Sequence, residues 1–361
     1  MQNKVLILAN SSSGLWGFRK ELIQSLKEKY KEVVASTPNS GSWENFESIG
    51  CRVIDTQIDR RGINPIKDLK LVLFYINLIK KEKPDRVITY TIKPNIYGGF
   101  SSRLLRVPYV VNITGLGTTF QNEGILKKIV TFLYKCALKK AAVVFFENQE
   151  NLQIFVDEGI VKEEQTCLLN GAGVNLEYYY PCDYPEDDEV IRFLFTGRVM
   201  KEKGVDELFE AMQRLRSDGI LCTLDILGYY EEDYEARIQQ YQDEGWLSFH
   251  GYQADVRPFV QNSHCFVLPS WHEGMANTNL ECAAMGRPVI TSNIYGCKEA
   301  AIDGVSGYLC EKKNADSLYY MMKKFILLSH QEKIDMGKYG RKHMEAVFDK
   351  KNVVKETIKK I

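Results

Sequence analysis

The sequence lacks any segment of about 18 apolar residues, the length needed to cross a bilayer. Its opening run, MQNKVLILANSS, is shorter than the apolar core of a cleavable signal peptide, so we expect a protein that is not exported. The nine cysteines include no C-x-x-C pair and fall in expected strands and helices. Together these absences predict a cytoplasmic protein whose cysteines stay reduced.

Metal and dinucleotide motifs are also missing. No two aspartates are separated by a single residue, and no histidines and cysteines have metal-binding spacing. Neither Gly14-Leu15-Trp16-Gly17 nor Gly115-Leu116-Gly117 extends to G-x-G-x-x-G, which counts against a dinucleotide-dependent oxidoreductase. We therefore expect no metal ion and no cofactor.

The chain has no net charge, but its charges are unevenly distributed: residues 51–150 hold 17 basic and 8 acidic residues. The neutral overall pI and the lack of an aromatic stacking motif make nucleic acid a poor candidate partner. A basic segment of this kind favours anionic lipid headgroups or a lipid diphosphate instead.

Residues 125–140, ILKKIVTFLYKCALKK, allow two interpretations. Ile129, Phe132, Leu133 and Cys136 share one side of a helix and the lysines lie largely elsewhere, as in a helix at a membrane interface. The commoner arrangement, which we favour, is a helix whose apolar side packs on a sheet.

Strand-like runs alternate with helical stretches, which predicts an α/β fold of parallel sheets covered by helices. At 361 residues the chain is long enough for two domains. We predict one at 1–176 and another at 190–349, joined by a polar, acidic linker at 177–189 and followed by a final helix at 350–361. The expected strands are 4–9, 33–37, 51–55, 86–90, 109–113, 143–147 and 166–169, then 192–195, 223–227, 248–250, 265–268, 289–291 and 308–310.

The most informative stretch is 268–290, LPSWHEGMANTNLECAAMGRPVI. A buried strand ends at Leu268, and helical spacing predicts a helix from near Glu273 to Met285. Its amide end suits a diphosphate, and Glu281 would lie two turns on, roughly 12 Å along the axis. The two carboxylates could then contact hydroxyls at opposite ends of a sugar nucleotide. Alternatively, they are ordinary glutamates favoured by the helix dipole.

A second motif, FLFTGRVMKEKG at 193–204, ends a strand in a glycine turn with two cations. Arg198 and Lys203 could bind a diphosphate and stabilise the charge that grows on it as a glycosyl bond breaks. As an isolated motif, a basic loop facing water is the commoner explanation.

Together these segments resemble the family 4 retaining glycosyltransferases. The likeness rests on Gly197-Arg198 with Lys203, on Glu273 and Glu281, on Gly286-Arg287-Pro288-Val289-Ile290, and on Asp303-Gly304 with Gly307. It implies a metal-independent enzyme with the GT-B architecture, in which the parallel sheets of two Rossmann-like domains face a central cleft. The resemblance also implies that the final helix, 350–361, returns to the first domain.

The resemblance also implies residue roles. Arg198 and Lys203 would hold the donor diphosphate, Glu281 the ribose and Glu273 the transferred sugar, while Gly14, in a loop after the first strand, would approach the phosphates from the other domain. Arg198, Lys203 and Glu273 are the expected catalytic residues. The expected donor-binding set is Gly14, Gly197, Arg198, Lys203, Glu273, Gly274, Met275, Ala276, Asn277 and Glu281.

Residues 89–99 and 112–120 resemble a narrower subgroup, N-acetylgalactosaminyltransferase-like enzymes that extend a sugar on polyprenyl diphosphate. This likeness makes Lys93, Asn95, Tyr97 and Thr114 the expected acceptor-binding residues. Pro94 and Asn95 could equally cap the helix that follows. Many members of the broad family carry a histidine where this chain has Thr114, so that histidine's contact to the sugar cannot be carried over.

The resulting prediction is a retaining transferase for bacterial surface polysaccharide or glycan assembly. It would move a hexose or N-acetylhexosamine from a UDP-sugar to a polyprenyl-diphosphate-linked saccharide at the inner leaflet of the cell membrane, to which it would bind peripherally. A UDP-sugar 2-epimerase-like isomerase is the alternative, but it needs acid and base residues over the sugar ring, and well-placed histidines are few.

Overall fold

A computed structural model describes residues 2–59, 62, 64–117, 120, 124–186 and 189–361. The chain divides into two compact units, Met1–Ala172 with Lys351–Ile361 (unit 1) and Gly173–Lys350 (unit 2). The segment 177–189, expected as the linker, belongs to unit 2 except for residues 187 and 188, which lie outside the described residues.

Unit 1 contains a seven-stranded sheet in the order β3-β2-β1-β4-β5-β6-β7, and all its neighbouring strands are parallel. Its central strands are apolar along most of their length because helices cover both faces. The strands are β1 (Gln2–Leu8), β2 (Tyr30–Ser36), β3 (Arg52–Ile54), β4 (Arg86–Tyr90), β5 (Tyr109–Ile113), β6 (Val143–Phe146) and β7 (Thr166–Leu168).

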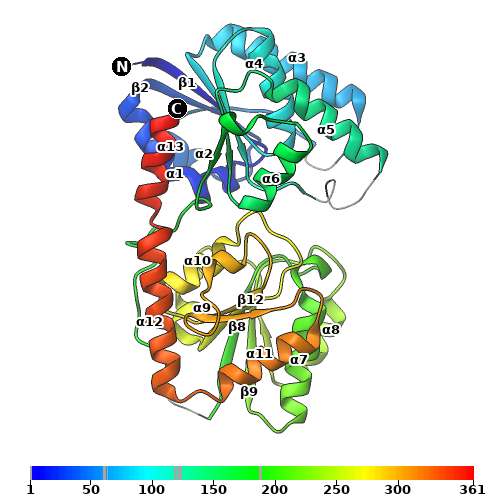
Figure 1. Ribbon diagram of the computed structural model, residues 1–361, viewed down its shortest axis with the longest axis vertical. Helices are drawn as coiled ribbons and strands as arrows, with labels where there is room; N and C mark the ends of the chain where they lie inside the picture. The colour runs from blue at the N-terminus through cyan, green and yellow to red at the C-terminus, as the bar shows by residue number, and fades with distance from the viewer. Residues whose placement is uncertain (1, 60–61, 63, 118–119, 121–123, 187–188) are drawn as a thin grey trace. The chain divides into compact units, whose positions relative to one another are not determined.

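The unit 1 helices fall into two groups, each packed on one apolar cluster. Helices α3 (Pro65–Glu82) and α5 (Ile125–Leu138) share a core with one set of strand side chains. Helices α1 (Ser12–Lys29) and α13 (Lys350–Lys360) share a second core with the alternate set. Figure 1 shows α3 and α5 beside α4 (Gly99–Leu104), away from α1 and α13. The remaining helices are α2 (Trp43–Ser48) and α6 (Gln149–Asp157).

Unit 2 contains a six-stranded parallel sheet in the order β10-β9-β8-β11-β12-β13 around a single apolar core. Its strands are β8 (Ile191–Thr196), β9 (Cys222–Leu227), β10 (Leu247–Phe249), β11 (Cys265–Leu268), β12 (Val289–Ser292) and β13 (Gly307–Cys310). Its helices are α7 (Val205–Ser217), α8 (Glu235–Asp243), α9 (Arg257–Asn262), α10 (Asn277–Ala284), α11 (Ala315–Ile326) and α12 (His330–Val347).

All the strands expected from the sequence are present, and their ends shift by no more than three residues. In both sheets the strand order reverses once, between β1 and β4 in unit 1 and between β8 and β11 in unit 2. Open parallel sheets bind ligands beyond the carboxyl ends of the strands at such a reversal. None of the helices in the described ranges is both long and apolar enough to cross a membrane.

Candidate active site

The two sequence motifs of unit 2 meet at the reversal of its sheet. Residues 197–204 follow β8 and residues 269–276 follow β11, and these two strands are hydrogen-bonded neighbours. The glycine turn with its cations therefore lies beside the loop that carries Glu273. Their convergence could not be read from sequence separation, since Lys203 and Glu273 stand 70 positions apart.

Lys203 and Glu273 form an ion pair, in which the ammonium Nζ contacts the carboxylate Oε1. Ser270 Oγ donates to the same oxygen at 2.8 Å. The Lys203 side chain is 16% exposed to solvent and the Glu273 side chain is 13% exposed. This pairing fixes both groups where a ligand can reach them. Sequence reasoning did not identify Ser270; the signal that could have found it is the S-x-x-E spacing of Ser270 and Glu273, which favours a contact between the two side chains.

Arg198 is the more accessible cation, with 38% of its side chain exposed and Nη1 3.7 Å from Glu231 Oε2. The neighbouring turn is compact, because a Cβ on Gly228 would lie 1.8 Å from the carbonyl oxygen of Gly197. The 3.7 Å between Arg198 and Glu231 means that the Glu231 carboxylate restrains the guanidinium only loosely. The Arg198 guanidinium can therefore turn toward an anion.

Gly204 and Gly296 allow the loops of the site to approach each other. Gly204 has φ +72°, and a Cβ there would lie 2.1 Å from the carbonyl oxygen of Pro269. Gly296 has φ +86°, and a Cβ there would lie 2.7 Å from the carbonyl oxygen of Glu273. Side chains larger than hydrogen would push the cation-bearing loop and the loop after β12 away from residues 269–274.

The helix start expected near Glu273 is wrong: α10 begins at Asn277. Ala276 N donates to Gly296 O at 2.7 Å and Asn277 N to Met275 O at 3.0 Å, so these amides are not available for a helix that starts earlier. Gly274, Met275 and Ala276 therefore form a loop before α10. Glu281 lies about one turn, not two, from the start of the helix.

Burial raises the pKa of Glu281 to about 7. A hydrogen bond from Tyr179 and the positive charge of Lys350 act against this shift. Glu281 keeps partial exposure, while Leu280 and Cys282 beside it are buried. Tyr179 lies in the segment that the sequence indicated as a linker, so no pattern marked it as a partner of Glu281.

In unit 1, Gly14 lies at the reversal between β1 and β4, but not in a loop as expected. Helix α1 begins at Ser12, and the side chain of its N-cap Ser11 accepts from Gly14 N at 3.1 Å. Gly14 therefore belongs to the first turn of α1, with a Cβ position 3.4 Å from Ser11 Oγ. The amide end of this helix faces the carboxyl edge of the sheet.

The expected acceptor residues of unit 1 follow β4 and β5. Lys93 Nζ contacts Asp68 Oδ1 at 2.7 Å, and the pKa of Tyr97 is raised by burial and by the same aspartate. Asn95 is 1% exposed and donates to Asn112 O at 2.8 Å, so it ties the π-helix Pro94–Gly98 to β5. Asn95 therefore lies beneath the surface, where its side chain holds the π-helix against β5.

Thr114 follows directly on β5 and is half-buried. Gly117, three residues later, has φ +64° and is exposed. The expected motif 112–120 continues through residues 118 and 119, which lie outside the described residues. Thr114 is thus at the carboxyl edge of the unit 1 sheet, as Lys93 and Tyr97 are.

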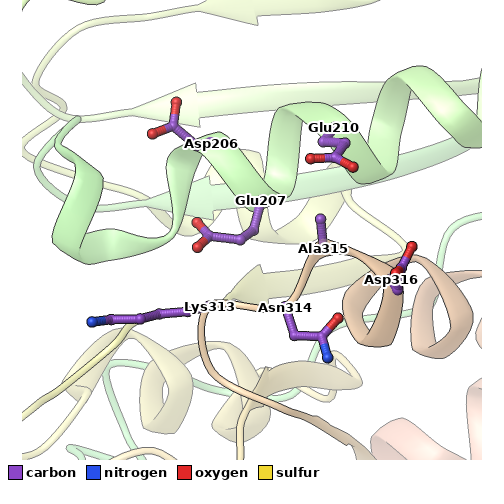
Figure 2. Close-up of a pocket in the computed structure, with 7 residues that line it drawn as sticks. All are labelled: Asp206, Glu207, Glu210, Lys313, Asn314, Ala315 and Asp316. Carbon is purple, nitrogen blue, oxygen red and sulfur yellow. The ribbon is translucent and has the colours of Figure 1, made fainter.

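A pocket of about 350 Å³ lies elsewhere in unit 2, between the start of α7 and the loop before α11. Figure 2 shows Asp206, Glu207 and Glu210 from α7 opposite Lys313, Asn314 and Asp316. Four carboxylates against one ammonium disfavour an anionic ligand, so this pocket is not the diphosphate site. Among the described residues, no group of three or more histidines, cysteines and acids could hold a metal ion.

Comparisons with known proteins decide the family. Residues 182–343 match the family model of the glycosyl transferases group 1, and residues 4–148 match the glycosyl transferase 4-like model. A UDP-Gal:alpha-D-GlcNAc-diphosphoundecaprenol alpha-1,3-galactosyltransferase of Escherichia coli is 30% identical over 275 residues, covering 71% of this chain and 70% of that protein. The chain belongs to the group 1 glycosyltransferases.

Another relative of this glycosyltransferase aligns along nearly its whole length. It is the N,N'-diacetylbacillosaminyl-diphospho-undecaprenol alpha-1,3-N-acetylgalactosaminyltransferase of Campylobacter jejuni, 25% identical over 375 residues that cover 99% of this chain and 98% of that protein. Among solved structures, HepE of Anabaena in complex with UDP and glucose superposes with a TM-score of 0.80 at 16% identity, covering 99% and 98% of the two chains. The glycosyltransferase thus has the GT-B fold, built from two Rossmann-like units with parallel sheets, as expected.

Proposed function

We propose that this glycosyltransferase moves a hexose or N-acetylhexosamine from a UDP-sugar to a saccharide on polyprenyl diphosphate, with retention and without a metal ion. The observation that carries the proposal is the convergence of Lys203 and Glu273 at the reversal of the unit 2 sheet. The names of the two relatives support the choice of a diphospho-undecaprenol-linked acceptor, and one of them names UDP-galactose as donor.

The donor would bind beyond β8 and β11. Arg198 and Lys203 supply two cations for the diphosphate, and Gly197 and the loop Gly274–Ala276 supply close backbone approach. Glu273 and Glu281 supply carboxylates for the hydroxyls of the sugar and the ribose. Asn277 opens α10, whose positive dipole end adds to the attraction for phosphate.

In the reaction, the anomeric carbon loses its bond to the diphosphate oxygen and forms a bond to the acceptor hydroxyl on the same face of the sugar. The acceptor proton passes to an oxygen of the departing UDP. Negative charge grows on that UDP as the bond breaks, and Arg198 and Lys203 stabilise it. The ion pair with Glu273 holds the Lys203 ammonium in place beforehand, so little reorganisation is needed.

The acceptor would be bound by unit 1 at the carboxyl edge of its sheet. Thr91 leaves β4 with φ +72°, an unusual value for a residue other than glycine, and Lys93 and Tyr97 follow it. In this proposal the Lys93 ammonium exchanges part of its bond to Asp68 for the lipid diphosphate, and Thr114 offers a hydroxyl. Asn95 would support this acceptor region indirectly, because it holds the π-helix to β5.

We further propose peripheral binding at the inner leaflet through the outer faces of α3, α4 and α5, called here the α3–α5 surface. These helices contact one another in sequence and lie together in Figure 1. Lysines on α3 and α5 surround the apolar side chains, so charge and apolar area both suit an anionic bilayer. The exposed side chains are Ile66, Leu69, Leu73, Phe100, Leu104, Ile125, Leu126, Ile129 and Phe132.

The orientation of α5 confirms that residues 125–138 pack on the sheet, and it supports the proposal of a membrane-facing side. Tyr134, Ala137 and Leu138 are buried in unit 1, whereas Ile129 and Phe132 are 50% and 64% exposed. The helix packs on the sheet through one side and leaves a second apolar side uncovered in unit 1. That second side is the part of α5 available to a membrane.

The test is an assay of the purified protein with several UDP-sugars, with and without an undecaprenyl-diphosphate-linked N-acetylhexosamine. We expect UDP release that requires the acceptor, a product whose new linkage is α by proton NMR, and unchanged turnover in EDTA. UDP release that never depends on the acceptor would reject transfer, a β product would reject retention, and loss of turnover in EDTA would reject metal independence.

A further inference from the structure

The loops after β8 and β11 are also joined beside the Lys203–Glu273 ion pair. Trp271 N donates to Glu202 O at 3.0 Å, and His272 Nε2 lies 3.2 Å from Glu202 Oε2. Because an ionised carboxylate can only accept, the hydrogen of this second bond belongs to the imidazole Nε2. The residues immediately before Lys203 and Glu273 are thus bonded to each other through their side chains.

Trp271 fastens the loop after β11 to other parts of unit 2. Its indole Nε1 donates to Glu207 Oε1, in α7, at 3.0 Å. The Lys313 ammonium lies 4.4 Å from the centre of the indole ring, a distance at which a cation and an aromatic ring attract each other. The backbone on the amino side of His272 is therefore held, and the imidazole reaches Glu202 from a fixed support.

A bound donor would disturb the Lys203–Glu273 ion pair but not its neighbour. In the proposed reaction Lys203 turns from Glu273 toward the diphosphate, which weakens the direct link between the loops. Glu202 and His272 have no part in binding the diphosphate or the sugar, so their bond can persist while the donor is present. Without that bond the loops could shift, and a misplacement of about 1 Å is enough to lose much of a catalytic rate.

We propose that His272 and Glu202 are positioning residues of the transferase, which hold Lys203 and Glu273 at their working separation once the donor lies between them. This inference rests on the proposed roles of Lys203 and Glu273 in donor binding. Neither His272 nor Glu202 needs to touch the donor. Each acts through the backbone of the residue that follows it.

The experiment uses full-length variants, the UDP-sugar and lipid-linked acceptor that give turnover in the assay above, and calorimetric titration with UDP. His272→Ala and Glu202→Ala should each lower kcat roughly 10-fold. UDP affinity should change less than about threefold, because UDP alone lacks the sugar that spans the two loops. The double variant should be no slower than either single variant, since each has already lost the pair.

Two further variants separate positioning from a general structural effect. His272→Gln should recover most of the lost turnover, because its amide nitrogen can donate where Nε2 does. Lys323→Ala is the matched control: Lys323, in α11, pairs with Asp218 at the end of α7 at 2.6 Å, and these side chains are 37% and 38% exposed, against 37% for His272 and 29% for Glu202. Breaking this pair should leave kcat unchanged.

Lys203→Ala distinguishes failure of this inference from failure of the proposed donor site. If Lys203→Ala keeps wild-type turnover, the role of Lys203 is rejected and the inference with it. If Lys203→Ala loses turnover but His272→Ala and Glu202→Ala keep it, the inference alone is overturned.

Other results would overturn the positioning role as well. Equal losses from His272→Ala and His272→Gln would show that the hydrogen bond to Glu202 is irrelevant. Losses that multiply in the double variant would show that the two side chains act independently. UDP affinity that falls as far as kcat, or an equal loss of kcat in Lys323→Ala, would indicate a general effect on unit 2.

Discussion

The Lys203 ammonium and the Glu273 carboxylate are bonded directly across the two loops that follow β8 and β11. A donor diphosphate entering this site would meet a cation that is already oriented and a carboxylate that is already paired. Because Ser270 also donates to Glu273, the carboxylate keeps a partner when Lys203 turns toward phosphate. In the proposed site a diphosphate could therefore bind Lys203 without leaving Glu273 as an isolated buried charge.

Replacing Lys203 tests the charge-stabilising role. Lys203→Ala should lower kcat by about 10²- to 10³-fold, the range for removal of one group that stabilises developing charge, and Arg198→Ala should act similarly. Lys201→Ala is the control, because Lys201 is an exposed cation two residues away that faces Trp271. Steady-state UDP release measures the effect. Wild-type turnover in both the Lys203 and Arg198 variants would contradict the assignment.

Glu281→Gln should stabilise the folded protein at alkaline pH. Burial raises the pKa of Glu281 from 4.5 to about 7, so the folded state binds more protons than the unfolded state between these values, and wild-type stability falls as pH rises through this window. Glutamine does not titrate. The gain should be about 2 kcal/mol at pH 8 after allowance for partial exposure, and absent below about pH 4.5.

Urea unfolding at several pH values measures this gain. A residue retained at a cost in stability is typical of a binding site, and the same variant should bind UDP more weakly. Equal stability of the two proteins at pH 8 would show that the carboxylate is not under strain from burial.

Gly204→Ala should damage both folding and turnover, because the added Cβ would lie 2.1 Å from the carbonyl of Pro269 at a positive φ. Gly219 offers a matched control: it has φ +80°, but a Cβ there would meet nothing within 4 Å. Gly219→Ala should cost about 1 kcal/mol from backbone strain alone. Gly204→Ala should cost more and lower kcat. Similar melting temperatures and similar kcat in the two variants would mean that close approach of the loops is unimportant.

The α3–α5 surface should carry membrane binding. Replacing Ile129 and Phe132 with serine should weaken co-sedimentation with phosphatidylglycerol vesicles by roughly tenfold or more, since each side chain contributes about 1.5 kcal/mol or more when buried. Leu327→Ser is the control, because Leu327 is 76% exposed in unit 2. Binding should also fall with added salt. An equal loss from the Leu327 variant, or none from the double variant, would contradict a specific membrane face.

Much of the fold was predictable from local pattern. Buried parallel strands are short apolar runs, and those at 86–90, 109–113 and 265–268 have the same bounds in the structure. The start of α10 was not predictable, because the amides of Ala276 and Asn277 are engaged by Gly296 and Met275 instead of by a helical turn. Gly296 is distant in sequence, and local helical periodicity takes no account of such a competitor.

The sequence by itself determined the alternation of strands and helices, and with it two parallel sheets, because burial on both faces demands apolar strands and each crossover demands a helix. It also supplied the cations and carboxylates of the proposed diphosphate site. Only the tertiary structure decided which of them meet: strand order put β8 beside β11 and so joined Lys203 to Glu273. Such pairings depend on contacts between segments far apart in the chain, and no local spacing encodes them.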